Sequence, residues 1–234
     1  MSIILAIESS SETASVAVRN GTRLWQRQVD GVQTHSHSLL PMVQAVLAEA
    51  GLRLDQCDAI AFGAGPGSFT GVRTACGIAQ GLAFGSDLPL LAVDTLATAA
   101  QACHEATGAQ AVLVVIDARM GEVYWAQYRF DPDGDASVVT APQLGLPASV
   151  TPVGAVQLCG NGVAVYADAF QGAVFEGAAR ADLMPHAAQG ALLGQRMFAR
   201  GQAVAARDAQ PVYLRNQIAL TTLERALARA ETVA

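Results

Sequence analysis

The sequence predicts an α/β protein with two lobes. Short apolar segments typical of strands alternate with segments of helical periodicity, a pattern that indicates parallel strands connected by helices. A strand, an acidic turn and a second strand open the chain, and the same arrangement returns after residue 110. With 234 residues, 52% of them hydrophobic, the chain can bury a substantial core. We expect a first lobe over residues 1–107, a second over 108–210, and a C-terminal segment, 211–234, that packs back on the first lobe.

The first lobe is expected to begin with a three-stranded β-meander. Its first strand is the apolar run at residues 3–7, and the next two are joined at Asn20–Gly21, a pair that favours a tight hairpin. Apolar side chains then recur at helical spacing from Leu39 to Ala50. The remaining elements are a strand at 59–62, a glycine-rich turn, a helix at 72–84, a strand at 88–93 and a helix, capped by Asp94–Thr95, that runs to residue 105.

The second lobe is expected to contain two strands, 111–116 and 123–130, joined by an acidic turn at Asp117–Gly121. Prolines and glycines in residues 131–152 predict an irregular surface loop. The last predicted elements are a strand near 153–159, a helix near 191–200 and an amphipathic helix near 219–230.

Charge and composition exclude several classes of protein. The net charge of −6 argues against strong independent binding to nucleic acid, because that affinity comes largely from cations that neutralise phosphates. All 14 basic residues are Arg, which excludes a P-loop lysine, a Schiff-base lysine and a Ser–Lys dyad. The four Cys residues are far apart and predict neither a disulfide framework nor a zinc site. No apolar run approaches the roughly 20 residues needed to cross a bilayer, and the N-terminus lacks the features of a signal peptide, so we expect a cytoplasmic protein without membrane contact.

Two acidic turns form the first candidate site. The first turn is Glu8 with Ser9, Ser10, Ser11, Glu12 and Thr13, and the second is Asp117–Gly121. The candidate phosphate-loop residues within them are Glu8, Ser9, Ser10, Asp117, Arg119 and Gly121. Such a turn offers backbone N–H groups to a phosphate and a carboxylate to its magnesium ion. A single one could equally be an ordinary polar hairpin. Two in register resemble the phosphate loops of the actin, hexokinase and Hsp70 superfamily, which implies its two-lobed, ribonuclease H-like fold.

A glycine-rich segment, Phe62–Arg73, precedes the second predicted helix. Its glycines permit backbone angles closed to other residues, and Ser68 or Thr70 can cap the helix. The segment is either a tight strand-to-helix turn or a loop that presents the helix N-terminus to an anion. Pro66 and the spacing of the glycines exclude the dinucleotide-binding fingerprint.

Gly77, Gly81 and Gly85 recur every four residues along this helix. Each glycine costs a helix about 1 kcal/mol relative to alanine, so three on one face indicate that another helix approaches closely. The approaching helix is either the one near Val43 of this chain or part of a second protein.

The histidines predict no metal site. His35 and His37 point to different sides of a helix, and the other two histidines lie in unrelated contexts. The sequence also lacks the G-x-S-x-G nucleophile elbow of serine hydrolases.

Together these residues resemble the TsaB family, formerly called YeaZ, over nearly the whole chain. The two most specific stretches are Gly65–Arg73 and Ile116–Arg119. The other similar stretches are Ile4–Glu8, His35–Val43, Gly77–Ala83, Met120–Tyr124 and Pro211–Asn216. The resemblance is weakest between residues 131 and 207.

The resemblance implies a non-catalytic relative of TsaD, the subunit that transfers threonylcarbamoyl to the adenosine beside the anticodon. TsaD-like proteins carry an H-x-x-x-H metal motif after the strand that corresponds to Leu90–Val93, where this chain has Asp94–Thr98 and no histidine. The adenosine-binding signature is reduced to the short turn Cys159–Gly162. We therefore expect no catalytic residue and no metal site.

The resemblance also implies partners. TsaB-like proteins pair with TsaD through two helices of the first lobe, in a four-helix bundle, are joined by the ATPase TsaE, and form homodimers through a similar surface. The expected interface residues are His35, Leu39, Val43, Leu47, Arg73, Gly77, Gly81 and Gly85. The resemblance implies that the complex, and not this chain alone, binds the tRNAs that read codons beginning with A. No cofactor is expected on the chain alone, and ATP or ADP with magnesium is implied at the junction with TsaD.

Other functions stay open on the residues alone. Glu8 and Asp117 would suit an active phosphotransferase of the acetate-kinase or sugar-kinase type. A glycoprotease-type peptidase and a free-standing homodimer that ignores TsaD are the further alternatives.

Overall fold

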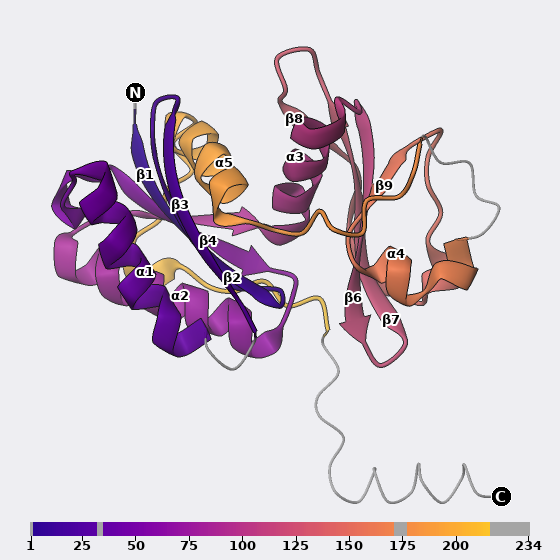
Figure 1. The fold of residues 1–234 in the computed structure, drawn as a ribbon, viewed down its shortest axis with the longest axis horizontal. Coiled ribbons are helices and arrows are strands. Elements are labelled where there is room, and N and C mark those ends of the chain that lie inside the picture. The colour runs from indigo at the N-terminus through magenta and orange to yellow at the C-terminus, as the bar shows by residue number, and fades with distance from the viewer. Residues whose placement is uncertain (1, 32–34, 171–176, 216–234) are drawn as a thin grey trace, which may run out of the picture.

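The computed structural model describes residues 2–31, 35–170 and 177–215, which form two lobes (Figure 1). The first sheet has the strand order β3-β2-β1-β4-β5, and the second has the order β8-β7-β6-β9. The strands are β1 (Ile3–Glu8), β2 (Thr13–Asn20), β3 (Arg23–Asp30), β4 (Ala59–Gly65), β5 (Leu90–Asp94), β6 (Ala111–Arg119), β7 (Glu122–Phe130), β8 (Ala136–Gly145) and β9 (Gln157–Cys159). The α-helices are α1 (His35–Ala50), α2 (Phe69–Ser86), α3 (Thr95–Thr107), α4 (Gly162–Val165) and α5 (Ala187–Ala199). Short 3₁₀ helices span Leu54–Gln56, Pro147–Ser149, Ala167–Phe170 and Ala206–Asp208.

The first lobe is a sheet covered on both faces. Strands β1, β4 and β5 run parallel, whereas β2 and β3 complete the sheet as an antiparallel meander. Because side chains alternate along a strand, Leu5 and Ile7 face the core beneath α1 and α2, while Ile4 and Ala6 face α5. Burial on both faces explains why the central strands are apolar without alternation.

The second lobe is a smaller sheet with the same β-meander followed by a parallel strand. Strands β6 and β7 form an antiparallel hairpin, and β9 pairs parallel to β6. Helix α3 covers one face, where Leu96 and Cys103 pack with Val114. Helix α4 and the 3₁₀ helix that ends at Phe170 cover the other face. The α/β class and the two-lobed actin and hexokinase type of fold are thus confirmed.

The assignment of helices to lobes differs from the sequence-based boundaries. Helix α3, expected in the first lobe, packs its buried face on the second sheet. Helix α5, expected in the second lobe, packs on the first sheet, where Ala187 and Ala191 contact its central strands. Each helix therefore packs on the sheet of the other lobe. The apolar sheet face that it covers belongs to that lobe and not to the lobe in which the sequence placed the helix.

Strand β8 was predicted to be part of a surface loop, and that prediction is wrong. The strand lies at the edge of the second sheet, where most of its side chains are exposed or half-buried. Its pairing with β7 is irregular between Trp125 and Tyr128, and Pro142 lies in this irregular part. Edge strands tolerate proline at such a bulge, so the residues that predicted a loop are compatible with a strand.

The other predicted strands and helices among the described residues are present, with ends shifted by a few residues. In the β2–β3 hairpin, Asn20 pairs with Arg23, and Gly21, with φ of 59°, is the first turn residue. The helix predicted near 219–230 lies outside the described residues. No described helix has the length and apolar character needed to span a membrane.

Candidate functional site

The first acidic turn lies at the C-terminal end of β1, and its first carboxylate turns inward. Glu8 is only 2% exposed, and its Oε1 accepts a hydrogen bond from the Ser10 backbone N–H at 2.7 Å. A Cβ at Gly63 would overlap the Glu8 carboxylate, so this side chain fills the space that the glycine leaves open. Burial raises the pKa of Glu8, and the nearby Asp94 adds to the rise. Glu8 is therefore directed into the protein and does not line the space between the lobes.

The glycine-rich segment after β4 packs against this first turn. A Cβ at Gly67 would lie 2.6 Å from the Ser10 carbonyl oxygen, and one at Gly71 would overlap the Ser9 carbonyl oxygen. The Ser9 hydroxyl donates to the Gly71 carbonyl oxygen at 2.9 Å, and the Ser68 N–H donates to the Ser10 carbonyl oxygen at 2.7 Å. Ser68 Oγ also accepts from the Gly71 N–H and so caps α2. These contacts favour the tight-turn interpretation, since the glycines are needed for two loops to pack.

The second acidic turn joins β6 to β7 in a left-handed backbone conformation. Arg119, Met120 and Gly121 have φ values of 63°, 58° and 79°. Such a conformation costs a non-glycine residue about 1–3 kcal/mol, so the surroundings must hold the turn in place. Within it, Asp117 Oδ1 accepts hydrogen bonds from the Arg119 backbone N–H at 2.8 Å and from the Tyr166 hydroxyl at 3.0 Å. The Asp117 carboxylate is thus engaged by groups of its own lobe.

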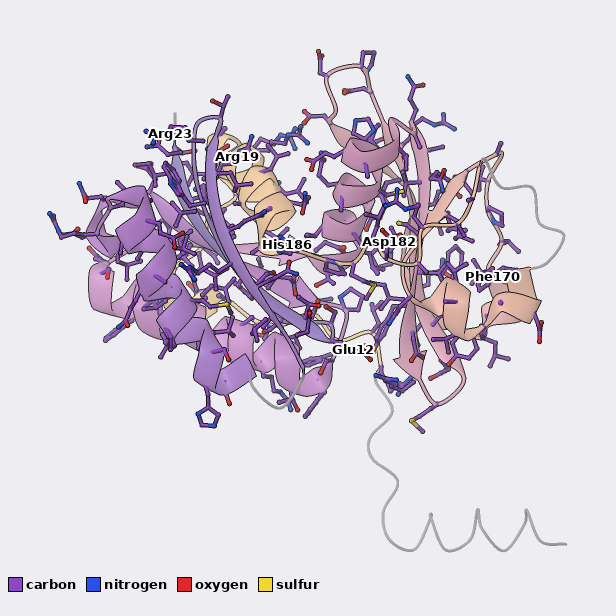
Figure 2. The ribbon with its side chains drawn as sticks, in the orientation of Figure 1. Glu12, Arg19, Arg23, Phe170, Asp182 and His186 are labelled. Carbon is purple, nitrogen blue, oxygen red and sulfur yellow. The ribbon has the colours of Figure 1, made fainter. Side chains whose placement is uncertain are left out.

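A cleft of about 690 Å³ lies between the two turns. Its lining includes Ser10, Glu12, Arg73, Asp117, Arg119 and Arg215. Arg119 forms an ion pair with Glu12 at 2.7 Å across this cleft and a second with Asp117 at 3.2 Å. Figure 2 shows Glu12 between the two lobes. One guanidinium therefore neutralises a carboxylate from each acidic turn, and the structure brings the two predicted turns together.

The short turn after β9 supports the second acidic turn. Asn161 Oδ1 accepts a hydrogen bond from the Asp117 backbone N–H at 2.9 Å. A Cβ at Gly160 would meet the Val115 carbonyl oxygen, so this glycine allows the turn to approach β6 closely. The segment that the sequence associates with adenosine binding thus packs on the protein's own strand.

The C-terminal segment crosses from the first lobe to the second along the cleft (Figure 1). The Val212 N–H donates to the Ala64 carbonyl oxygen at 2.7 Å in the first lobe. Arg215 donates to the carbonyl oxygen of Ala118 at 3.0 Å and to Glu122 at 2.6 Å in the second lobe. Sequence reasoning included Glu12 in the first acidic turn but gave it no role, and it did not select Arg215, because only the folded topology brings Arg119 to Glu12 and Arg215 to the second turn.

The solvent-facing side of α2 combines small residues with large apolar ones. Arg73, Gly77, Gly81 and Gly85 are all exposed. No described atom lies within 4 Å of a Cβ placed at any of the three glycines, so α1 does not pack against them. Phe84 is 86% exposed on the same helix. The glycines therefore leave a smooth, uncovered helix surface rather than serving a contact within the chain.

Phe69, at the start of α2, begins an aromatic cluster that continues this surface. It is 61% exposed, and the Arg73 guanidinium lies 3.3 Å from its ring centroid. Arg73 Nε donates to the Tyr213 hydroxyl at 2.8 Å. Sequence reasoning did not select Phe69 or Phe84 for the partner surface, because the sequence alone does not show which face of the helix stays uncovered.

Three of the predicted interface residues on α1 need correction. Leu39, Val43 and Leu47 are buried in the core of the first lobe, so they cannot offer their side chains to a partner without unfolding. The exposed apolar position of this helix is Leu40, which is 44% exposed. His35 is the first residue of α1, and its side chain lies outside the described part.

The position of the TsaD metal motif is occupied by a helix cap. Asp94 Oδ1 accepts a hydrogen bond from the Ala97 N–H at 2.8 Å, and the Tyr128 hydroxyl donates to the same oxygen at 3.2 Å. Burial raises the pKa of Asp94. Across residues 2–31, 35–170 and 177–215, no three His, Cys, Asp or Glu side chains are placed to hold a metal ion.

Comparison with known proteins agrees in sequence and in structure. The family model described as "TsaD: tRNA N6-adenosine threonylcarbamoyltransferase" matches residues 26–222. The TsaB protein of Escherichia coli, described as a tRNA threonylcarbamoyladenosine biosynthesis protein, is 40% identical over 229 residues, which cover 92% of this chain and 96% of that protein. The TsaB protein of Haemophilus influenzae is 48% identical over 124 residues, which cover 53% of this chain and 52% of that protein.

Solved structures give the same result. The structure of YeaZ from Pseudomonas aeruginosa superposes with a TM-score of 0.83 at 40% identity, and covers 92% of this chain and 100% of its own. A second structure from that organism, described as an uncharacterized protein similar to the peptidase YeaZ, has a TM-score of 0.84 with the same identity and coverage.

Proposed function

This chain belongs to the TsaB family within the wider TsaD family, and from that premise we propose that it takes part in forming threonylcarbamoyladenosine in tRNA as a non-catalytic subunit. The role in this pathway is supported by relatives named for it at 40% identity over nearly the full chain. In the proposal, the chain binds a TsaD-type catalytic subunit and, with it, the ATPase TsaE, in the cytoplasm.

The observation that carries the partner role is the uncovered face of α2. Three glycines at a spacing of four give a groove along which another helix can approach closely, and Phe84 beside them offers an apolar anchor. On α1, which contacts α2, Leu40 is a further exposed apolar side chain. A second copy of the chain could use the same face, so the homodimer and the TsaD complex would exclude each other.

The interior of the cleft supports the non-catalytic part of the proposal. Glu8 is buried against Gly63, and Asp117 is held by Arg119 and Tyr166, so neither carboxylate is free to bind the magnesium ion of a nucleotide. A phosphotransferase would need such a carboxylate facing its cleft. We therefore place any ATP or ADP with magnesium at the junction with the catalytic subunit, and propose that tRNA is bound by the complex, because this chain is acidic.

Reconstitution tests the role directly. Threonylcarbamoyladenosine is measured in a mixture of TsaD, TsaE, threonylcarbamoyl-adenylate synthase and tRNA, with this chain, without it, and with it in place of TsaD. We expect product only when both this chain and TsaD are present. Equal product without this chain would refute the subunit role, and product without TsaD would establish an enzyme instead.

The partner surface is tested with Gly81→Leu. A leucine at this open position would prevent close approach of a helix, and we expect co-purification with TsaD to be lost while the chain stays folded. The matched control is Ala106→Leu, which adds similar bulk at an exposed position of α3. Co-purification of Gly81→Leu at the level of the control would rule out the α2 face as the interface.

A further inference from the structure

We propose that residues Val212–Arg215, here called the strap, act as an internal lock that occupies one side of the cleft and holds the two acidic turns in a fixed relation. All four strap residues line the cleft. The strap is bound to one lobe at its first residue and to the other at its last, so it ties the lobes together as a bridging ligand would.

At its first end, the strap is seated on the loop that follows β4. The Val212 N–H donates to the Ala64 carbonyl oxygen at 2.7 Å. A Cβ at Gly65, whose φ is 107°, would lie 2.7 Å from the Val212 carbonyl oxygen. Both backbone groups of Val212 thus lie against the glycine-rich segment, which in turn packs on the first acidic turn through Ser68 and Ser10.

At its second end, the strap holds the strained second turn. Arg215 donates to the Ala118 carbonyl oxygen at 3.0 Å and to the Glu122 carboxylate at 2.6 Å. These two residues flank the turn whose Arg119 and Met120 both have positive φ. Because that conformation is costly, the contacts of Arg215 supply part of what keeps it in place.

Between its ends, the strap has contacts on both sides of the cleft. Tyr213 accepts a hydrogen bond from Arg73 of α2, and its ring centroid lies 6.0 Å from that of Phe69. Leu214 packs against the core of the second lobe. The Arg119–Glu12 ion pair spans the cleft beside the strap, but both of its side chains are more than 60% exposed, so this pair alone would hold the lobes weakly. The strap is the stronger connection because it combines the Val212 backbone hydrogen bond, the packing of Leu214 and an Arg215–Glu122 ion pair whose side chains are only 25% and 32% exposed.

The test weakens the contacts of the strap with one lobe and measures hydrogen exchange in the turns of both lobes. Arg215→Gln removes the guanidinium contacts with Ala118 and Glu122 of the second lobe, and Gly65→Ala pushes Val212 away from the first. Hydrogen–deuterium exchange is followed by mass spectrometry in peptides covering residues 63–72 and 117–122. If the strap is a lock, each variant should speed exchange in both peptides by about tenfold or more, because the turns lose their fixed relation.

The control is Arg207→Gln, which makes the same change at a side chain that is 87% exposed and pairs with its neighbour Asp208. It should leave exchange in both peptides unchanged. Acceleration confined to the lobe in which each substitution was made would overturn the proposal and leave the strap with two independent local contacts. Should Gly65→Ala fail to fold, the effect of Arg215→Gln on residues 63–72, in the opposite lobe, decides the question alone.

Discussion

The Glu8 side chain is ionised only at a cost, because it is buried and another carboxyl group, Asp94, lies near it. Its raised pKa means that the folded protein binds this proton more tightly than the unfolded chain does. The stability that Glu8 contributes is therefore fully present below its ordinary pKa of 4.5 and is lost as the pH rises through the raised value.

Glu8→Gln tests this cost. Gln keeps the shape and the acceptor for the Ser10 N–H but carries no charge. The free energy of unfolding of the variant should therefore be about 1 kcal/mol higher than that of the wild type at pH 7, which means a more stable protein. The gain should shrink towards pH 4. Urea unfolding between pH 4 and pH 8 measures it. Glu49→Gln, at an exposed ion pair with Arg27, should show no comparable gain. A Glu8→Gln variant that is less stable at every pH would mean that the carboxylate is required for its geometry.

His186 gives a second residue-scale prediction with the opposite dependence on pH. Its Nδ1 accepts a hydrogen bond from the Ala188 N–H and caps α5, which only a neutral ring can do, and Nε2 lies 3.0 Å from Gln28 Oε1. Burial lowers the pKa of His186 below 6.5. The stability from this cap is present above pH 6.5 and is lost as the pH falls from there towards the lowered value.

His186→Asn should keep the cap without the titration, since Asn is a strong N-cap residue. We expect its unfolding free energy to be within about 0.5 kcal/mol of the wild type at pH 8 and to fall less steeply between pH 6.5 and pH 5. His186→Ala should instead lose about 1 kcal/mol at pH 8. Identical pH profiles for the wild type and the Asn variant would show that His186 does not titrate in this range.

The glycines of α2 lower the stability of the helix but leave its surface open to a partner. Gly81 is exposed and open, so nothing in the described chain opposes a methyl group there. Gly81→Ala should raise the unfolding free energy by about 0.5–1 kcal/mol, because alanine restricts the unfolded chain and favours the helix. Thermal unfolding of the isolated protein measures this. A stability below that of the wild type would indicate that the glycine serves the fold itself.

Local patterns predicted most of the elements, and the failures have identifiable causes. Strands β1, β4 and β6 were predictable because buried parallel strands are long apolar runs between turn residues. Strand β8 was not, because an edge strand needs no apolar alternation and can accept Pro142. The inward direction of Glu8 was also unpredictable, since it depends on the space left by Gly63, fifty-five residues away in the chain.

For the whole molecule, the two acidic turns could be paired from sequence, but the connection between the lobes could not. Repetition of strand, turn and strand indicated a duplicated arrangement with a shared cleft, and the fold confirms it. The exchange of α3 and α5 between the sheets and the contacts of Arg215 depend on distant surfaces that leave no periodic signal. The interface residues implied on α1 were overestimated for a related reason, because the family resemblance indicates which helix meets a partner without saying which of its side chains this chain already buries.

The position of α5 also bears on the order in which the protein is made. One face of the first sheet, with Ile4, Ala61 and Leu91, is covered by a helix that begins only at Ala187. As the chain leaves the ribosome, that apolar surface has no partner until most of the protein has been translated. A nascent chain stalled in the second lobe would therefore expose the back of its first sheet, and it is at this stage, rather than after release, that we expect the protein to depend most on chaperones.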